Sequence, residues 1–372
     1  MAGKRHHIIP KFLQKGFASR SESETVWTWH YRKNTAEPVE ISTKDSIVSE
    51  HFYGKGGESA DPIITEYETT KLAPLVDALR HGSAQCNDVV KEIAELIAHL
   101  TIRTKVVRKG FEEMSERFLH GIGTIFSDDD LIADAIASQP DSYLFDQFDS
   151  VFSDPTFPTD GILEMLDAEG ISREDVSNAV VPLVRKQLAD EDGRREFVEG
   201  ASTFLTDLLG PMQMLVADSI KSGHIKALRE NVNSGIRVEV FESFHWELQL
   251  CDFDLVLGDS GTVFESVQHQ RFIPLCELDD IAKVILPLSS NRALIGQRDT
   301  FTLDKITPQI NQHLARCSCE QFVASSHSDE FRKLVPLIGA DVALVPETMI
   351  AAELDDIRNN LKGVIGEKED EE

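Results

Sequence analysis

The chain has 372 residues, of which 37 are lysine or arginine and 64 are aspartate or glutamate, so its formal net charge is 37 − 64 = −27. A charge of this sign opposes passive adhesion to nucleic acids and anionic membranes, so any contact with a nucleic acid must be made by a local basic pocket. The length and the apolar content of 41% allow one large domain or two medium ones with a sizeable core.

The sequence also bears on the compartment. No signal peptide is recognisable, and no stretch approaches the roughly 20 apolar residues that are needed to span a bilayer. Cys317 and Cys319 lie in a predicted helix, where a separation of two residues turns them in different directions. The remaining cysteines, which show no paired spacing either, are Cys86, Cys251 and Cys276. We therefore expect a reduced, cytoplasmic protein with no membrane association.

The first 17 residues are more apolar than a chain terminus usually is. His6 and His7 stand between a basic pair and an apolar run, and Pro10 opens an amphipathic helical turn that ends near Phe17. We expect this segment to be buried in the body of the protein. Adjacent side chains on extended backbone point in opposite directions, so only one of the two histidines is expected to enter a given pocket.

The next elements are a hairpin and a set of helices. Aromatic and β-branched residues alternate over residues 25–31 and are followed by a polar turn and the segment VEI, which predicts a β-hairpin. Apolar residues at helical spacing predict helices over residues 63–79, 87–118 and 195–233. Residues 126–195 are acidic and interrupted by proline, and we interpret them as a variable helical insert.

After Gly235 the pattern is that of strands. The runs RVEVFESF, HWELQL, FDLVLGDSGTVFES, FIPLC, KVILPLSS and RALIG predict an antiparallel sheet of several strands. Helices are predicted over residues 307–324 and 347–360. The tail over residues 363–372 is acidic, and we expect it to be disordered.

The expected fold class is α+β, with an N-terminal β-hairpin, a helical middle and a C-terminal antiparallel sheet closed by helices. We expect one α+β domain over residues 1–325, with the acidic helical insert at about 126–195. A C-terminal helical extension is expected over residues 326–362.

The segments RHHIIPKFLQKGFA, HFY, ITEYETTKLAPLVDAL and LTIRTK follow one another in a pattern that resembles the bacterial domain of unknown function 4238 family. The strands FHWELQL, VLGDSGTVF and VILPLSS and the helix around Asn311 fit its later part, so the resemblance covers about residues 5–325. The turn of the family usually reads Thr-Ser-Asp-Asn-Pro, whereas this chain has Leu-Gly-Asp-Ser-Gly and retains Asp259. The resemblance implies the fold and a candidate site, and no activity.

Five residues are candidates for carrying chemistry. A neutral imidazole of His6 or His7 can bind a metal ion or accept a proton near pH 7. Glu68 lies near the apolar face of its helix. Arg103 lies within an apolar stripe, where an unpaired charge is costly, so we expect it to pair with Glu68 or Asp259. Asp259 follows a strand at a turn flanked by glycines, where a ligand can approach closely.

Two functional hypotheses follow. In the first, His6 or His7, Glu68, Arg103 and Asp259 form the catalytic site of a hydrolase or nuclease that acts on nucleic acid or a phosphate ester. Mg²⁺ or Mn²⁺ would be held by His7 and Asp259, and Arg103 would hold a phosphate. Such enzymes are often bacterial toxins or antiviral defence effectors. In the second, the same residues form a structural network or a pocket in a non-catalytic binding or regulatory protein. Both hypotheses leave room for a protein partner or a homo-oligomer.

Short motifs narrow the choice further. HHIIP is similar to the HHxxP start of His-Asn-His nucleases, but no further histidine follows until His30, so the match is weak. The string GDSG resembles a serine-protease motif, but the other motifs of that fold are absent. The sequence has no Walker loop, dinucleotide-binding glycine motif, CxxC pair or HExxH motif. Their absence argues against P-loop NTPases, Rossmann oxidoreductases, zinc ribbons and zincins.

Overall fold

The computed structural model of the chain divides into two compact units. The structure describes residues 5–23, 25–126, 128–146, 172–230, 232, 235–298, 305–342 and 347–366. The first unit takes in residues 1–113 and 217–344, and the second takes in residues 114–216 and 345–372. The segment expected as an acidic insert, residues 126–195, lies within the second unit. No helix among the described residues is long and apolar enough to cross a bilayer.

The N-terminal segment is buried, as the sequence predicts. It forms strand β1 (Arg5–His7), helix α1 (Lys11–Gln14) and the 3₁₀ turn η1 (Lys15–Phe17). Side chains that are at most 1% exposed include Ile8, Ile9, Leu13 and Phe17. Strand β1 pairs antiparallel with β5 (Val48–Glu50), so both backbone pairing and apolar burial hold this segment in the first unit.

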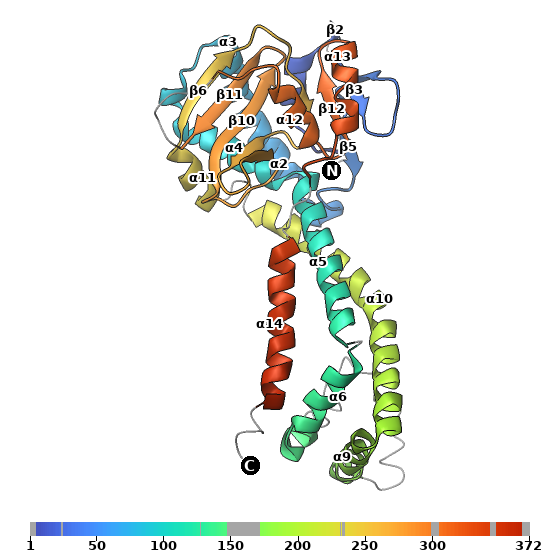
Figure 1. Cartoon of the computed structure of the whole chain (residues 1–372). Helices are drawn as coiled ribbons and strands as arrows, with labels where there is room; N and C mark the ends of the chain where they lie inside the picture. The colour runs from blue at the N-terminus through green and yellow to red at the C-terminus, as the bar shows by residue number, and fades with distance from the viewer. Residues whose placement is uncertain are drawn as a thin grey trace. The chain divides into compact units, whose positions relative to one another are not determined.

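An antiparallel sheet with the strand order β6–β11–β10–β8–β9 confirms the sheet expected in the C-terminal half. Figure 1 shows three of its strands, β6, β11 and β10, side by side. Its strands are β6 (His245–Leu250), β8 (Val263–Ser266), β9 (Arg271–Ile273), β10 (Ile281–Ser289) and β11 (Arg292–Gln297). The central strand β10 has a run of fully buried side chains from Val284 to Leu288. A continuous apolar run of this kind is typical of a strand that is covered on both faces.

A second sheet joins the two ends of the first unit. Its order is β2–β3–β12–β7, with β4 also paired to β3. Its strands are β2 (Arg20–Glu22), β3 (Thr25–Arg32), β4 (Val39–Ser42), β7 (Leu257–Gly258) and β12 (Gln321–Ala324). The pairing of β3 with β4 confirms the predicted hairpin. Strand β12 lies antiparallel to β3, so residues from both ends of the unit share one sheet.

Two segments differ from the expected elements. The run RVEVFESF is helix α11 (Gly235–Glu242) and not a strand; it packs on helix α4 (Val90–Ile102). Its buried residues, Val238 and Phe241, are three apart, and so short an apolar run does not distinguish helix from strand. The helix expected over residues 307–324 ends early, because α12 (Ile310–Arg316) gives way to β12. Strand β12 is drawn into the sheet by partners on both of its edges.

The run FDLVLGDSGTVFES contains two strands that belong to different sheets. Strand β7 lies in the sheet with β12, and β8 lies in the sheet with β10. The chain passes from one sheet to the other through the turn after β7, where Gly261 has a φ of +75°. Asp259 therefore lies at a crossing between two sheets, which explains why it is buried.

One continuous helical stretch carries Glu68, one of the candidate residues. It consists of α2 (Asp61–Tyr67), the π-helical segment η3 (Glu68–Leu72) and α3 (Ala73–His81). The expected helix over residues 87–118 is instead interrupted: α4 ends at Ile102 and α5 (Lys105–Phe126) follows. Arg103 lies at this junction, with φ −91° and ψ 1°.

The remaining helices include those of the second unit. Among the described residues, the second unit contains α6 (Asp129–Ser138), α9 (Arg173–Ala189), α14 (Glu347–Gly366), the later part of α5 and the first part of α10 (Glu191–Glu230). The last residues of α10 belong to the first unit. Short elements complete the first unit: η2 (Gly56–Glu58), η4 (Cys86–Asp88), α13 (Asp329–Arg332) and η5 (Val335–Leu337). The start of the tail expected to be disordered, residues 363–366, is helical, and residues 367–372 lie outside the described residues.

Candidate functional site

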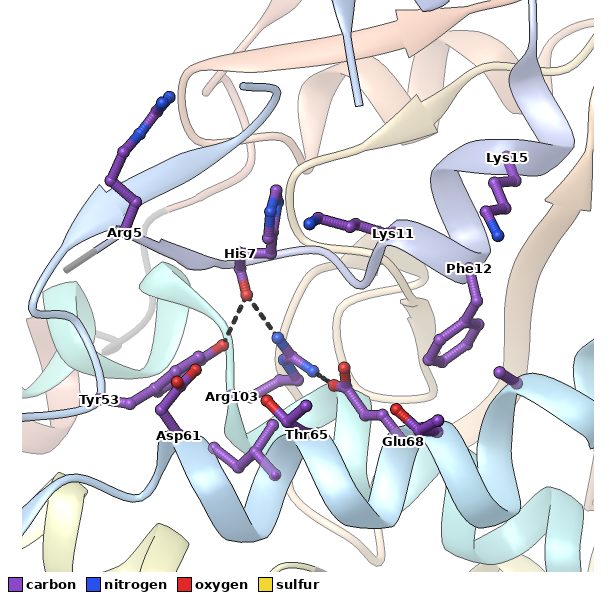
Figure 2. A pocket seen from close by; sticks show the side chains of 13 residues that line it. Arg5, His7, Lys11, Phe12, Lys15, Tyr53, Asp61, Thr65, Glu68 and Arg103 are labelled. Carbon is purple, nitrogen blue, oxygen red and sulfur yellow. Dashed lines mark hydrogen bonds and ion pairs between the residues drawn. The ribbon is translucent and has the colours of Figure 1, made fainter. Parts of the chain in front are cut away.

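A cavity of about 310 Å³, open to solvent, lies between the N-terminal segment and the helical stretch α2–η3–α3 (Figure 2). Three groups of side chains line it. The N-terminal segment supplies Arg5, His7, Lys11, Phe12 and Lys15; the helical stretch supplies Asp61, Ile64, Thr65, Glu68, Thr69 and Ala73; and Tyr53 and Arg103 complete the lining. Three of the five candidate residues from the sequence, His7, Glu68 and Arg103, therefore line this cavity. A fourth, His6, precedes His7 on the same strand.

The two N-terminal histidines have different surroundings, as the alternation along a strand predicts. His6 is 1% exposed, its ring is stacked on that of Tyr53 with centroids 5.2 Å apart, and its Nδ1 accepts a hydrogen bond from the Tyr53 backbone N–H. His7 is half-buried and lines the cavity. His6 thus anchors the strand, and His7 is the histidine that a ligand can reach.

The position of the proton on the ring of His7 is fixed by its surroundings. Nδ1 lies 3.1 Å from the carbonyl oxygen of Ser46, which can only accept, so Nδ1 carries the hydrogen. Burial lowers the pKa of His7 to about 4, and the positive charges of Lys11 and Arg103 add to this. The ring is therefore neutral at pH 7, and Nε2 has a free lone pair. In Figure 2 the ring and the carbonyl oxygen of His7 point to opposite sides of the strand.

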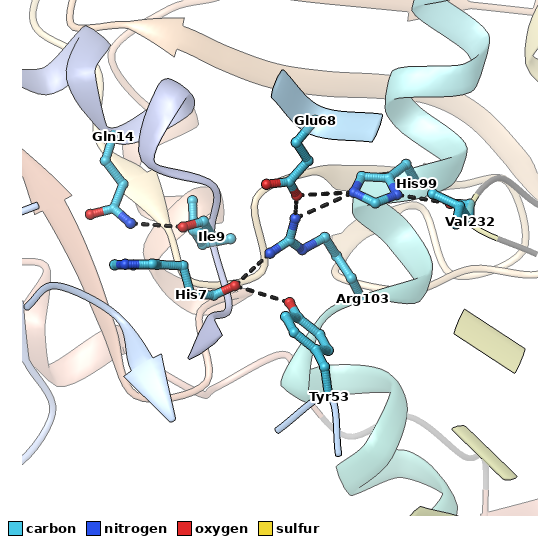
Figure 3. Close-up of polar contacts among 8 residues, drawn as sticks. All are labelled: His7, Ile9, Gln14, Tyr53, Glu68, His99, Arg103 and Val232. Carbon is cyan, nitrogen blue, oxygen red and sulfur yellow. Dashed lines mark hydrogen bonds and ion pairs between the residues drawn. The ribbon is translucent and has the colours of Figure 1, made fainter. Parts of the chain in front are cut away.

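Arg103 joins the N-terminal strand to the helices beneath it (Figure 3). It is 1% exposed, and one of its nitrogens donates to the carbonyl oxygen of His7 at 2.5 Å. The other terminal nitrogen contacts Oε1 of Glu68, so the expected ion pair of these two residues is present. The hydroxyl of Tyr53 donates to the same His7 carbonyl at 3.0 Å. The position of His7 is therefore set by a buried cation and a buried phenol.

His99 completes this network, although the sequence analysis did not single it out. Its Nδ1 donates to the carbonyl oxygen of Val232 at 2.8 Å, so Nε2 is left to accept from Arg103 at 3.3 Å. Burial lowers the pKa of His99 to about 4, which keeps the ring neutral. A signal was available in the sequence, since His99 precedes Arg103 by four residues and so shares its face of the helix.

Glu68 is the carboxylate held by this network. One oxygen faces Arg103 and lies 3.1 Å from Nε2 of His99, and the other points away from both (Figure 3). The side chain is 15% exposed. A carboxylate that is fixed at one oxygen and open at the other can accept a hydrogen bond from a ligand hydroxyl.

The π-helical segment η3 was not predicted either, and it begins at Glu68 itself. Pro74 gives a physical reason for it. Proline lacks a backbone N–H and its ring clashes with the carbonyl four residues earlier, which in this chain is that of Thr70. Widening the preceding turn relieves the clash, and such turns occur frequently at functional sites. Here the widened turn bears Glu68 and Thr69, which both line the cavity.

Asp259 is not part of this site. It is 3% exposed, and its two oxygens accept from the backbone N–H groups of Cys319, Glu320 and Gln321 at 2.6, 2.9 and 3.2 Å. Burial raises its pKa to about 6, against the lowering effect of these hydrogen bonds. The expectation that Asp259 is an alternative partner of Arg103 is therefore wrong, because Asp259 instead fixes the turn before β12.

The glycines beside Asp259 also have a structural role. A Cβ on Gly258 would lie 2.4 Å from Oγ of Ser318 and 3.0 Å from the carbonyl oxygen of Leu314. The close approach that the glycine permits is thus to the chain's own backbone and side chains. It does not leave room for a ligand.

The residues present do not fit a divalent metal. Both oxygens of Asp259 are engaged by backbone donors, and Oε1 of Glu68 faces a guanidinium. Throughout the part of the chain that the structure describes, no group of three or more His, Cys, Asp or Glu side chains is placed to hold a metal ion. The expected pairing of His7 with Asp259 as metal ligands has no support in this geometry.

Comparisons with known proteins do not assign a family. No family model matches the chain, and no curated protein or solved structure matches it. The resemblance to the domain of unknown function 4238 family stays a hypothesis that rests on sequence motifs. What the fold and the cavity define is an α+β protein with a basic pocket at its N-terminal strand.

Proposed function

We propose that this pocket binds a phosphate-bearing ligand, either a phosphate ester or the end of a nucleic acid. One observation carries the proposal: basic side chains outnumber acidic ones in the lining by four to two, in a chain whose net charge is −27. The four are Arg5, Lys11, Lys15 and Arg103, and the two are Asp61 and Glu68. A basic cavity in an otherwise acidic protein concentrates anions locally.

The lysines are the groups best placed to meet the phosphate. Lys11 and Lys15 are four residues apart on α1 and η1, both are exposed, and no ion pair is described for either. Arg5 shares its charge with Asp45 at 2.6 Å, and the charge of Arg103 is balanced by Glu68. The opposite wall offers the hydroxyl-bearing residues Thr65 and Thr69. The open oxygen of Glu68 suits a hydroxyl on the organic part of an ester.

A metal-independent phosphoesterase is the second candidate, and the orientation of His7 favours it. With Nδ1 held by Ser46, Nε2 can accept a proton from a water molecule. The water oxygen would then form a bond to phosphorus while the bond from phosphorus to the ester oxygen breaks, and the leaving oxygen would take a proton from solvent. The alternative is a binding or regulatory protein that uses the same pocket without this step.

Calorimetric titration of the full chain with inorganic phosphate and with a nucleoside monophosphate tests the binding proposal. Replacing both Lys11 and Lys15 by Gln should weaken binding by about tenfold or more, because each lost charge–phosphate contact contributes about 1 kcal/mol or more. Lys91→Gln is the matched control, since Lys91 is exposed on α4 and does not line the pocket. Equal affinity in the double variant and the wild type would refute the proposal.

Turnover of p-nitrophenyl phosphate and bis(p-nitrophenyl) phosphate tests the hydrolytic candidate. His7→Gln should abolish turnover and leave phosphate binding within about twofold, because the basic nitrogen is lost and the lysines remain. If the wild type binds phosphate but turns over neither compound, the pocket is that of a binding protein.

A further inference from the structure

A second basic cavity, of about 430 Å³, lies in the first unit and has no part in the proposed function. Residues of the segment 51–58 form one of its walls, and the last two turns of α10 form the other. The residues that matter to its chemistry are Lys55 and Glu58 from the segment and Lys221, Ile225, Lys226 and Arg229 from the helix. Its volume lies within the range of ordinary ligand pockets.

The charge of this cavity is unbalanced. Four cations face it against one carboxylate, an excess of 4 − 1 = 3, whereas the whole chain is strongly negative. Lys221, Ile225 and Arg229 follow one another at intervals of four residues, so they share one face of the helix. Of these four cations, only Lys226 forms an ion pair within the part of the chain that the structure describes; its partner is Glu230, at 4.0 Å. Like charges gathered on one face repel each other unless an anion lies between them.

The loop wall is held close to the helix by a glycine. Gly54 has a φ of +97°, a conformation that other residues rarely adopt. A Cβ at this position would lie 3.3 Å from Cγ2 of Ile225 and 3.1 Å from Cα of Ser59. Glycine therefore lets the loop lie against Ile225, and this places Lys55 at the cavity that Lys221 and Arg229 face.

The two residues that precede Gly54 are held by contacts with the rest of the first unit. Arg108 lies over the ring of Phe52 at 3.9 Å and donates to its carbonyl oxygen at 2.8 Å. The same guanidinium donates to Nδ1 of His224, whose Nε2 is bonded to the carbonyl oxygen of Ile102. The next residue, Tyr53, is fixed by its bond to the N-terminal strand. The loop with Gly54 and Lys55 thus follows a segment that several contacts anchor to the first unit.

We propose that this second cavity binds an anion that carries two or more phosphate groups. Lys221 and Arg229 are eight residues apart, which at a rise of about 1.5 Å per residue is about 12 Å along the helix. A single phosphate meets both charges only if the two long side chains bend toward each other, whereas a chain of phosphates meets them where they stand, with Lys55 contacting it from the loop. The shared chemistry is that of a nucleoside triphosphate, an inorganic polyphosphate or a nucleic acid backbone. A compact ligand is favoured, because an extended one would meet the negative charge of the rest of the chain.

Calorimetric titration of the full chain with inorganic tripolyphosphate tests this proposal. Replacing both Lys221 and Arg229 by Gln should weaken binding by about tenfold or more and make the affinity less dependent on salt between about 50 and 200 mM. Both side chains are exposed, so the melting temperature should not change. Lys91→Gln should bind as the wild type does. Absence of binding to the wild type, or equal binding to the double variant, overturns the proposal.

Two further arms separate this cavity from the first pocket and identify the source of the phosphates. The Lys11→Gln, Lys15→Gln double variant should keep its tripolyphosphate affinity; loss of affinity there would assign the ligand to the first pocket and overturn the proposal. Displacement of tripolyphosphate by a nucleoside triphosphate supports a free ligand, and displacement by a single-stranded oligonucleotide supports a nucleic acid backbone. In this same double variant, inorganic phosphate that binds as tightly as tripolyphosphate would refute the requirement for several phosphates.

Discussion

The guanidinium of Arg103 and the carbonyl oxygen of His7 are joined by a hydrogen bond of 2.5 Å, although 96 residues separate them in the sequence. The same arginine meets Glu68 and His99 with its other terminal nitrogen. A single buried cation therefore sets both the backbone that bears His7 and the carboxylate on the opposite wall. The pocket should keep its shape only while this cation is present.

Arg103→Met should strongly destabilise the protein. The substitution leaves the carboxylate of Glu68 and the carbonyl of His7 without their donor, and breaking a buried pair in this way costs about 3–5 kcal/mol. Urea denaturation measures the change in the free energy of unfolding. Arg5→Met is the control, because both side chains of the ion pair between Arg5 and Asp45 are exposed to solvent, and such a pair contributes at most about 1 kcal/mol to stability. Similar losses in the two variants would contradict the central role of Arg103.

Stability should fall as the pH drops from about 6.5 to about 4. Burial is the main cause of the pKa values of about 4 for His7, His30 and His99, whereas an exposed histidine has a pKa of about 6.5. Below pH 6.5 the unfolded chain binds protons that the folded chain does not. Each neutral histidine therefore makes its full contribution to the free energy of unfolding above the pKa that it has in the unfolded chain, and this contribution is lost as the pH falls. For the fully buried His30 and His99 the loss is at most about 1.4 kcal/mol per pH unit.

The titration of Asp259 has the opposite effect on stability over part of this pH range. Its pKa is raised from 3.8 to about 6, so between these values the folded protein binds a proton that the unfolded chain does not. It offsets the effect of about one histidine, and the net change remains destabilising. Midpoints of urea denaturation at about pH 7.5, 6 and 5 measure the net effect of the histidines and Asp259 on stability. His30→Gln should make the midpoint less dependent on pH. A midpoint that does not change over this range would count against neutral buried histidines.

Asp259→Asn should lower stability and leave phosphate binding in the first pocket unchanged. An amide can accept at one oxygen only, and its NH₂ group would face backbone N–H donors of residues 319–321. A buried donor without an acceptor costs about 1–3 kcal/mol. Thermal unfolding together with phosphate titration distinguishes this result from that expected of a site residue. A variant that folds normally but no longer binds phosphate would restore Asp259 to the site.

Gly16→Ala should destabilise the protein by about 1–3 kcal/mol, the usual cost of overpacking. A Cβ at Gly16 would lie 2.1 Å from the carbonyl oxygen of Leu288, so η1 and β10 would have to move apart. Gly57→Ala is the control, since a Cβ there meets nothing within 4 Å and its φ is not positive. Equal melting temperatures for the two variants would contradict the close approach of the N-terminal segment to the sheet.

Local patterns were enough to predict part of this fold. The apolar spacing between Ile8 and Phe17 indicated burial, and the alternation over residues 25–31 indicated the hairpin. Strand β10 was evident as an apolar run with turn formers at its end. The pairing of Arg103 with Glu68 could be expected as well, because a charge within an apolar stripe needs a partner.

Other features depend on contacts that no local pattern contains. Helix α11 and strand β12 are both short apolar segments, and the element on which each packs decides its conformation. His99 became part of the site because Val232, 133 residues away, accepts the hydrogen of its Nδ1. Asp259 looked like a functional turn residue because the sequence does not show that residues 319–321 surround it.

The sheet that pairs β3 with β12 has a consequence for synthesis. His30 bonds to Gln321 across 291 residues, and β12 is the strand that connects β3 to β7. At about 5–20 residues per second, a ribosome needs roughly 15–60 s to make the intervening chain. During that time the hairpin leaves its edge unpaired, and pairing of such distant segments is slow. The edge of β3 is thus open to pairing with other chains until β12 has been made.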